Sequence, residues 1–127
     1  MLAVCQELDL APENTAIPQI ASGFAGGIGN TGAVCGAVVG AVMAIGLKME
    51  RGETMEDLLR VGSAAQEFRK RFEAEMGTIS CRELTGVDLN TEEGMKQAMN
   101  TNLAQKVCFP AVGTAYQLVL DVLEETN

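Results

Sequence analysis

Histidine is missing from the 127 residues of this chain, and so is tryptophan. Without an imidazole the chain has no Ser–His or Cys–His couple, no histidine ligand for zinc and no histidine to hold a haem. Basic residues are scarce as well, because nine Lys and Arg face 17 Asp and Glu, for a net charge of −8. That balance argues against nucleic acid as a partner and gives no attraction to anionic membranes. Any chemistry must therefore depend on cysteines, carboxylates or a bound cofactor.

Aromatic residues are few too, with one Tyr and four Phe in a chain that is 47% hydrophobic. The core must then be packed from Ala, Val, Leu, Ile and Met, a composition that suits helices better than a β-sandwich. The length fits one domain with a core of its own. We expect residues 1–127 to form a single cysteine-bearing domain of the all-α class, a bundle of four to six helices around a buried Gly/Ala-rich central helix.

The central helix is predicted within residues 14–47, because this stretch carries no formal charge. Its continuous apolar part, residues 33–47, is shorter than the roughly 20 residues that span a membrane. We therefore expect a helix buried on all sides and no membrane insertion. Gly32, Gly36 and Gly40 recur at every fourth position, which predicts that neighbouring backbones come very close. A helix so rich in small residues could also form the interface of a homodimer.

Periodicity and boundary residues predict the other helices. They cover residues 1–8, 13–22, 54–77, 80–86, 91–100 and 107–122. A break at residues 9–12 follows the first, Pro18 is expected to disturb the second, and Pro110 marks the start of the last or a kink in it. Thr54 and Asp57 form an N-cap pattern. The helix that follows them carries one apolar stripe, made of Met55, Leu58, Leu59, Gly62, Ala65, Phe68 and Phe72.

Three of the four cysteines share a position on the predicted helices. Cys35, Cys81 and Cys108 each lie near the start of a helix or just inside one, after a glycine, a serine or a polar stretch. A thiol at the N-terminal end of a helix faces the positive end of the macrodipole, which favours the thiolate. Helix ends from distant parts of a sequence can meet at one end of a bundle. Taken alone, Cys35 is better explained as a small buried apolar residue, and the shared position is what makes it a candidate redox thiol.

Glycines surround Cys35 on both sides. The residues that would let a cluster, a substrate or another backbone come close are Gly26, Gly27, Gly29 and Gly36. No Cys-x-x-Cys pair occurs in the chain, so neither a thioredoxin-like pair nor a zinc ribbon is predicted. With no recognisable secretion signal, four cysteines indicate a reducing cytosol, where thiols bind metal or cycle redox more often than they form structural disulfides. We expect a cytoplasmic protein.

The cysteines and glycines also occur in a recognisable order. The segments that carry it are residues 26–29, 35–40 with 41–47 after them, 68–72, 80–84 and 107–108. In this order they resemble the C-GCAxxG-C-C family of small redox-active proteins, whose hallmark is a CGAxxG segment with three further cysteines. The resemblance covers nearly the whole chain. It implies a redox-active cysteine protein in which Cys35, Cys81 and Cys108 are the second, third and fourth family cysteines.

The first family cysteine has no counterpart at the expected place. In the family it opens the first helix, a few residues upstream of where Met1 falls, whereas Cys5 lies later in that helix. We therefore expect this chain either to be a form shortened at its N-terminus or to have an incomplete site, and Cys5 to be an ordinary core cysteine rather than a substitute ligand. A related domain occurs in split-Soret cytochromes, and this relation implies iron–sulfur or electron-transfer chemistry.

Three functions remain open from the sequence. In the first, Cys35, Cys81 and Cys108 hold an iron–sulfur cluster and the protein carries electrons to a redox partner protein. In the second, Cys35 attacks in thiol–disulfide exchange and Cys81 or Cys108 resolves the mixed disulfide. In the third, the chain is a non-catalytic binding module, and the same three cysteines hold a structural zinc ion. Whether the protein is an oxidoreductase is left open.

Overall fold

The computed structural model describes residues 1–9 and 16–126, and in these residues the regular structure is helical. The helical elements are α1 (Leu2–Glu7), α2 (Ala16–Ala21), η1 (Ser22–Phe24), α3 (Ala25–Ile28), α4 (Gly36–Met49), α5 (Met55–Met76), α6 (Cys81–Thr85), α7 (Glu92–Asn100) and α8 (Phe109–Glu125), where η1 is a 3-10 turn. A π-helical segment, η2 (Ala104–Cys108), leads into α8. The predicted all-α class is confirmed.

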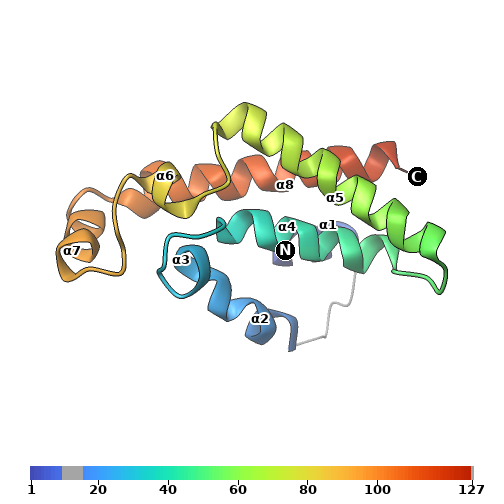
Figure 1. Cartoon of the computed structure of the whole chain (residues 1–127), viewed down its shortest axis with the longest axis horizontal. Helices are drawn as coiled ribbons and strands as arrows, with labels where there is room; N and C mark the ends of the chain where they lie inside the picture. The colour runs from blue at the N-terminus through green and yellow to red at the C-terminus, as the bar shows by residue number, and fades with distance from the viewer. Residues whose placement is uncertain (10–15, 127) are drawn as a thin grey trace.

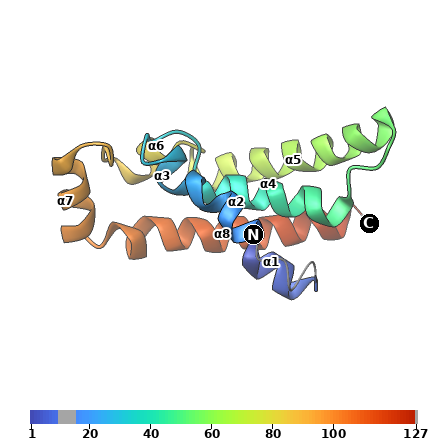
Figure 2. The same cartoon turned by 90° about the horizontal axis from the view of Figure 1, so that it is seen from below.

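Three long helices, α4, α5 and α8, run side by side along the molecule and contact one another in all three pairs (Figures 1 and 2). Their facing sides form one core together with Val4 of α1, and its other members are Val38, Ala41, Ala44, Ile45, Ala64, Phe68, Phe72, Ala111, Ala115, Val119, Val122 and Leu123. Phe68 and Phe72 are its largest members, and their ring centroids lie 5.9 Å apart. Small residues on α4 and α8 leave room for these two rings from α5.

The central helix, α4, begins later than the sequence predicts. It starts at Gly36, because residues 33–35 are extended and Val34 forms an isolated antiparallel bridge with Ser80. This pairing joins segments that are far apart in the sequence, so no local pattern announces it. The expectation that the helix is buried on all sides is also wrong. One face is buried in the core, but Val42, outside that face, is 39% exposed.

The small residues of α4 allow the close approach that their spacing predicts. A Cβ built on Gly36 would lie 3.2 Å from the carbonyl oxygen of Phe24, and one on Gly40 would lie 3.3 Å from the amino nitrogen of Met1. Both distances are tighter than ordinary van der Waals contact. Backbone from η1 and from the start of the chain therefore lies directly against α4.

The long helix α5 begins as predicted and then departs from the predicted stripe. The Thr54 side chain accepts a hydrogen bond from the Asp57 N–H, and the Asp57 carboxylate accepts one from the Thr54 N–H, which completes a capping box. Phe68 and Phe72 are buried, but Met55 and Leu59 are 68% and 63% exposed. The first turns of α5 lie at one end of the bundle (Figure 1), so the stripe packs only in its later part.

The shorter helices have the predicted order, with differences at their ends. α2 runs through Pro18, the third residue of the helix, where a missing N–H costs no helical hydrogen bond. The predicted start of this helix at Glu13 and most of the break at residues 9–12 lie outside the described residues. α6 ends at Gly86, whose φ of 72° is left-handed, and α7 begins after the N-cap Thr91.

One described helix, Ala104–Glu125, is long and apolar enough to cross a membrane by length and composition alone. In this fold its inner face forms part of the core, through Ala111, Ala115 and Val119. A core helix of a globular bundle passes the same length and composition test.

Candidate functional site

Cys35 and Cys81 are placed by the pairing of two extended segments. The Cys35 N–H donates to the carbonyl oxygen of Ile79 at 2.7 Å, and the Cys81 N–H donates to that of Ala33, also at 2.7 Å. In this antiparallel pairing Cys35 lies opposite Ile79, so Cys35 and Cys81 are diagonal neighbours on the same face. Each cysteine then begins or precedes a helix, since Cys35 is the N-cap of α4 and Cys81 is the first residue of α6.

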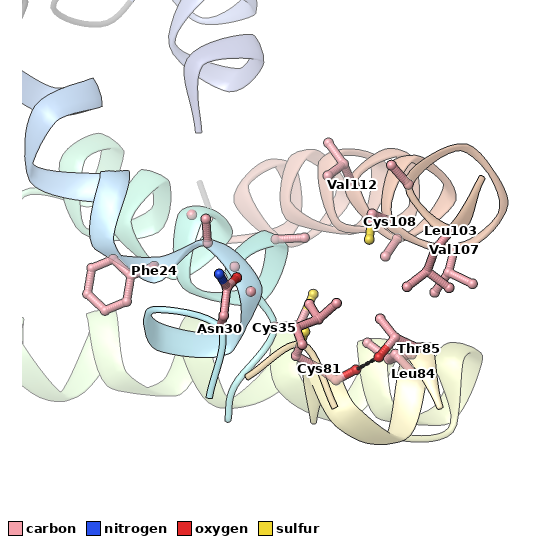
Figure 3. Close-up of a pocket in the computed structure, with 18 of the residues that line it drawn as sticks. Phe24, Asn30, Cys35, Cys81, Leu84, Thr85, Leu103, Val107, Cys108 and Val112 are labelled. Atoms are coloured by element: carbon pink, nitrogen blue, oxygen red, sulfur yellow. Dashed lines mark hydrogen bonds between the residues drawn. The ribbon is translucent and has the colours of Figure 1, made fainter. Parts of the chain in front are cut away.

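Local sequence explains why α6 begins and ends around Cys81. The hydroxyl of Ser80 accepts a hydrogen bond from the Glu83 N–H, which caps the helix, and left-handed Gly86 terminates it. The hydroxyl of Thr85 donates to the carbonyl oxygen of Cys81 at 2.8 Å (Figure 3). The Cys81 backbone is therefore held from both sides, by Ala33 and by its own helix.

A left-handed turn, residues 26–30, packs behind Cys81. All five residues have φ between 61° and 70°, so α3 is not a regular right-handed helix here. Ala33 and Thr31 close the turn, because the Ala33 N–H and the Thr31 hydroxyl both donate to the carbonyl oxygen of Gly27. Four of these positions suit Gly or Asn, but Ile28 is β-branched and is strained in this conformation. Backbone strain of this kind is typical of functional sites.

Gly27 shows why this turn needs glycine. A Cβ at Gly27 would lie 2.6 Å from the amide nitrogen of Ala33 and 2.7 Å from the Cβ of Cys81. Gly29, in the same turn, has open space where its Cβ would be. Of the four predicted glycines, Gly26 and Gly36 line the pocket around the cysteines, Gly27 supports Cys81 from behind, and Gly29 lies away from both.

Cys108 comes from the other side of the site. It is the last residue of η2, and the helix continues from there into α8. Pro110 is the second residue of α8, as predicted, and the wider π turn directly precedes it, because proline cannot donate the N–H of a regular α turn. In Figure 3 the sulfur of Cys108 points toward the pocket, with Cys35 and Cys81 opposite.

The three cysteines line one pocket of about 1000 Å³. Its walls come from α1, α2, η1, α3, α4, α6, α7, η2 and α8, and they are mainly apolar, with Phe24, Leu84, Leu103, Val107 and Val112 among the side chains drawn in Figure 3. The predicted convergence of Cys35, Cys81 and Cys108 is therefore present in the fold. Sequence reasoning missed the apolar walls, although Met95 and Met99, four residues apart on the polar helix α7, were a signal of an apolar face on this helix, and both line the pocket.

Burial and mutual repulsion act on two of the thiols. Burial raises the pKa of Cys81, and the nearby thiols of Cys35 and Cys108 raise it further. Burial also raises the pKa of Cys108, with Cys35 adding to the effect. Both thiols are therefore more resistant to ionisation than a free cysteine. These effects agree with the shared pocket, which brings the three thiols near one another.

Cys5 takes no part in this site. It is buried on α1, next to Val4, and it does not line the pocket. Its place agrees with the expectation of an ordinary core cysteine.

The spacing of these thiols differs from that of a mononuclear metal site. Among residues 1–9 and 16–126, no three Cys, Asp or Glu side chains are grouped so that they could hold one metal ion. All four cysteines are free thiols.

An all-α fold in which three cysteines from separate segments meet at one apolar pocket defines a helical protein with a multi-thiol site. The chain matches the family model described as "Putative redox-active protein (C_GCAxxG_C_C)" over residues 1–122, and it belongs to that family. Neither the comparison with curated proteins nor the comparison with solved structures gave a match. Membership of the family indicates a redox-active protein.

Proposed function

We propose that this protein is an electron carrier in which Cys35, Cys81 and Cys108 hold an iron–sulfur cluster. The observation that carries the proposal is the convergence of these three thiols, from α4, α6 and η2, on one pocket. Thiolates are the ligands that iron–sulfur clusters take, and no histidine in the chain competes with them.

The spacing of Cys35 and Cys81 favours a cluster over a disulfide. Diagonal neighbours in an antiparallel pair have Cα atoms about 7–8 Å apart, whereas a disulfide joins Cα atoms roughly 4.4–6.8 Å apart. The two 2.7 Å hydrogen bonds of the pairing oppose the backbone shift that a disulfide would need. In a [4Fe–4S] cluster each cysteine binds a different iron atom, so these ligands lie farther apart than the ligands of one ion. This also argues for a cluster rather than a structural zinc ion.

The chain's own residues define the surroundings of such a centre. The side chains around the pocket are mainly apolar, and the residues that line it include no Lys, Arg, Asp or Glu. When bound, an iron–sulfur cluster takes up and releases single electrons at a potential that burial and hydrogen bonds to the sulfur atoms set. Three cysteines leave one coordination position to a ligand from outside this set, and Cys5 does not face the pocket.

The test is cluster content in matched cysteine variants. Protein is purified without air, and its visible absorption, iron and acid-labile sulfide are measured for the parent and for Cys35→Ala, Cys81→Ala and Cys108→Ala. We expect a coloured parent protein and a loss of most iron and sulfide in each variant. Cys5→Ala is the control and should keep the parent's iron and sulfide. Equal iron in the parent and in all three pocket variants would exclude the proposed ligands.

A second function is supported by the position of Cys108. It faces Cys35 across the pocket (Figure 3) from a π-helical segment rather than from a regular helix. In thiol–disulfide exchange the Cys35 thiolate would attack a substrate disulfide and release one substrate thiolate, and Cys108 would then displace the second and form a Cys35–Cys108 disulfide. Metal-free protein that gains a Cys35–Cys108 cross-link on oxidation, and loses it on reduction, would favour this function over the cluster.

The proposed setting is the reducing cytosol, with a redox partner protein as the other member of the electron transfer. Free thiols in all four positions agree with that setting.

A further inference from the structure

The side chains that line the pocket beside the cysteines carry no charge, and the charged group at its wall is the amino terminus of Met1. The described residues that line it include no acidic or basic side chain, although the chain has 17 acidic and nine basic residues. Away from that amino group, a charged ligand group placed among these apolar walls would lose its hydration without gaining a counter-charge. The ligand that suits this pocket is therefore neutral. Phosphate-bearing cofactors such as dinucleotides and flavin nucleotides do not fit that description.

Uncharged hydrogen-bonding groups stand around the same apolar space. The side-chain amides of Asn30, Asn102 and Gln105 line the pocket, and none of them makes a hydrogen bond with another described residue. An amide both donates and accepts. These groups can therefore satisfy a ligand that carries carbonyl oxygens in one state and hydroxyl groups in another.

We propose that this pocket binds a quinone-class ligand, a flat, neutral, apolar ring with two opposed oxygen atoms. Its size fits, because pockets for small ligands have volumes of roughly 300–1000 Å³ and this one has about 1000 Å³. The amides can donate to the oxygens of the quinone and accept from the hydroxyl groups of the hydroquinone. The role of this ligand as the electron partner of the cysteine site rests on the proposed function, whereas its binding rests on the pocket alone.

The first test compares neutral and charged ligands of the same class. Metal-free protein with reduced thiols is titrated without air with durohydroquinone and followed by NMR. The fully methylated ring leaves no carbon for thiols to add to, and the reduced form cannot oxidise the cysteines. We expect saturable binding of one molecule per chain. The hydroquinone of anthraquinone-2,6-disulfonate, which carries two negative charges, should not bind.

Matched variants locate the site. Val112 lines the pocket and is 52% exposed, so Val112→Glu introduces a charge there without burying it in the core. We expect this variant to bind durohydroquinone at least about tenfold more weakly, because the ligand would have to desolvate the carboxylate. Val42→Glu places the same charge on α4 away from the pocket, where Val42 is also exposed, and should bind like the parent. Gln105→Leu keeps the apolar wall and removes an amide, and we expect a loss of about fivefold.

Three results would overturn the proposal. They are unchanged binding by Val112→Glu, binding of the disulfonate as tight as that of durohydroquinone, and equal binding of durene, which has the same methylated ring but no oxygen atoms. The protein in this experiment contains no iron, so a failure of quinone binding leaves the cluster proposal standing. A failure of the iron and sulfide measurement likewise leaves quinone binding standing.

Discussion

At the scale of single residues, the site depends on a few positions where a side chain would collide or strain the backbone. Gly27 lies against Cys81 and Ala33, and Gly29 stands free in the same left-handed turn. The two glycines share the backbone conformation and differ in their surroundings. They therefore separate the effect of strain from the effect of contact with the cysteine.

Gly27→Ala is predicted to displace Cys81, and Gly29→Ala is its matched control. The first should lower the free energy of unfolding by about 2–4 kcal/mol, because left-handed strain adds to overpacking. The second should cost only about 1 kcal/mol of strain. Denaturant unfolding measures both, and iron binding should fall in Gly27→Ala alone. Equal effects of the two substitutions would show that the contact with Cys81 has no role.

Ile28 is predicted to be a destabilising residue. It holds a φ of 64°, and its side chain is half exposed, so little packing compensates for the strain. Ile28→Gly should raise the free energy of unfolding by about 1 kcal/mol, since glycine adopts this conformation without strain. Denaturant unfolding of the variant measures the change. A variant less stable than the parent would mean that packing of the Ile28 side chain outweighs its backbone strain.

At the scale of elements, the start of α5 is held by the capping box. The side-chain hydrogen bond from Thr54, followed by its backbone hydrogen bond, lowers the pKa of Asp57. A carboxylate with a lowered pKa stabilises the fold above its unfolded pKa, and this contribution is lost as pH falls through the folded pKa. Acid should therefore weaken this end of α5 first.

Asp57→Asn is predicted to be less stable than the parent at pH 7 and to lose that difference in acid. Thermal unfolding at a series of pH values between 7 and 2 measures the gap in Tm. Glu75→Gln removes an exposed carboxylate outside the capping box and is the control. A gap that stays constant from pH 7 to pH 2 would contradict the role of the ionised carboxylate.

Local sequence was enough to predict the helix ends that are determined by nearby residues. Helix ends are marked within a few residues by Thr54 with Asp57, by Ser80 with Gly86, and by Thr91. Each of these boundaries is found in the structure. The start of α4 was missed because residues 33–35 pair with residues 79–81, and that contact is not local. The exposed start of α5 was missed because periodicity shows which face is apolar and not how far the neighbouring helices extend.

At the scale of the whole molecule, the core of α4, α5 and α8 supports the pocket at one end. The placement of Cys35 and Cys81 at helix starts was predicted from sequence, whereas Cys108 lies inside the continuous helix Ala104–Glu125. The meeting point of the three follows from the packing of these elements. The pocket itself could not be predicted, since its walls come from nine elements whose contacts arise only in the fold. The homodimer and the cytosolic location stay predictions.

Phe68 is predicted to be central to this core. It is fully buried, so Phe68→Ala should lower the free energy of unfolding by about 3–5 kcal/mol through lost burial and a residual cavity. Phe109→Ala is the control, because Phe109 is 62% exposed and should cost far less. Denaturant unfolding compares the two, and similar losses would show that α5 is not packed against α4 and α8 as described.

The most direct test of the account is the iron and acid-labile sulfide content of the protein purified without air. If Cys35, Cys81 and Cys108 hold a cluster, iron and sulfide will be present in equal amounts and will be lost together when any one of the three is replaced by alanine. Colourless protein without iron or sulfide, even after reconstitution with both, would contradict the account and leave thiol–disulfide exchange as the function of these cysteines.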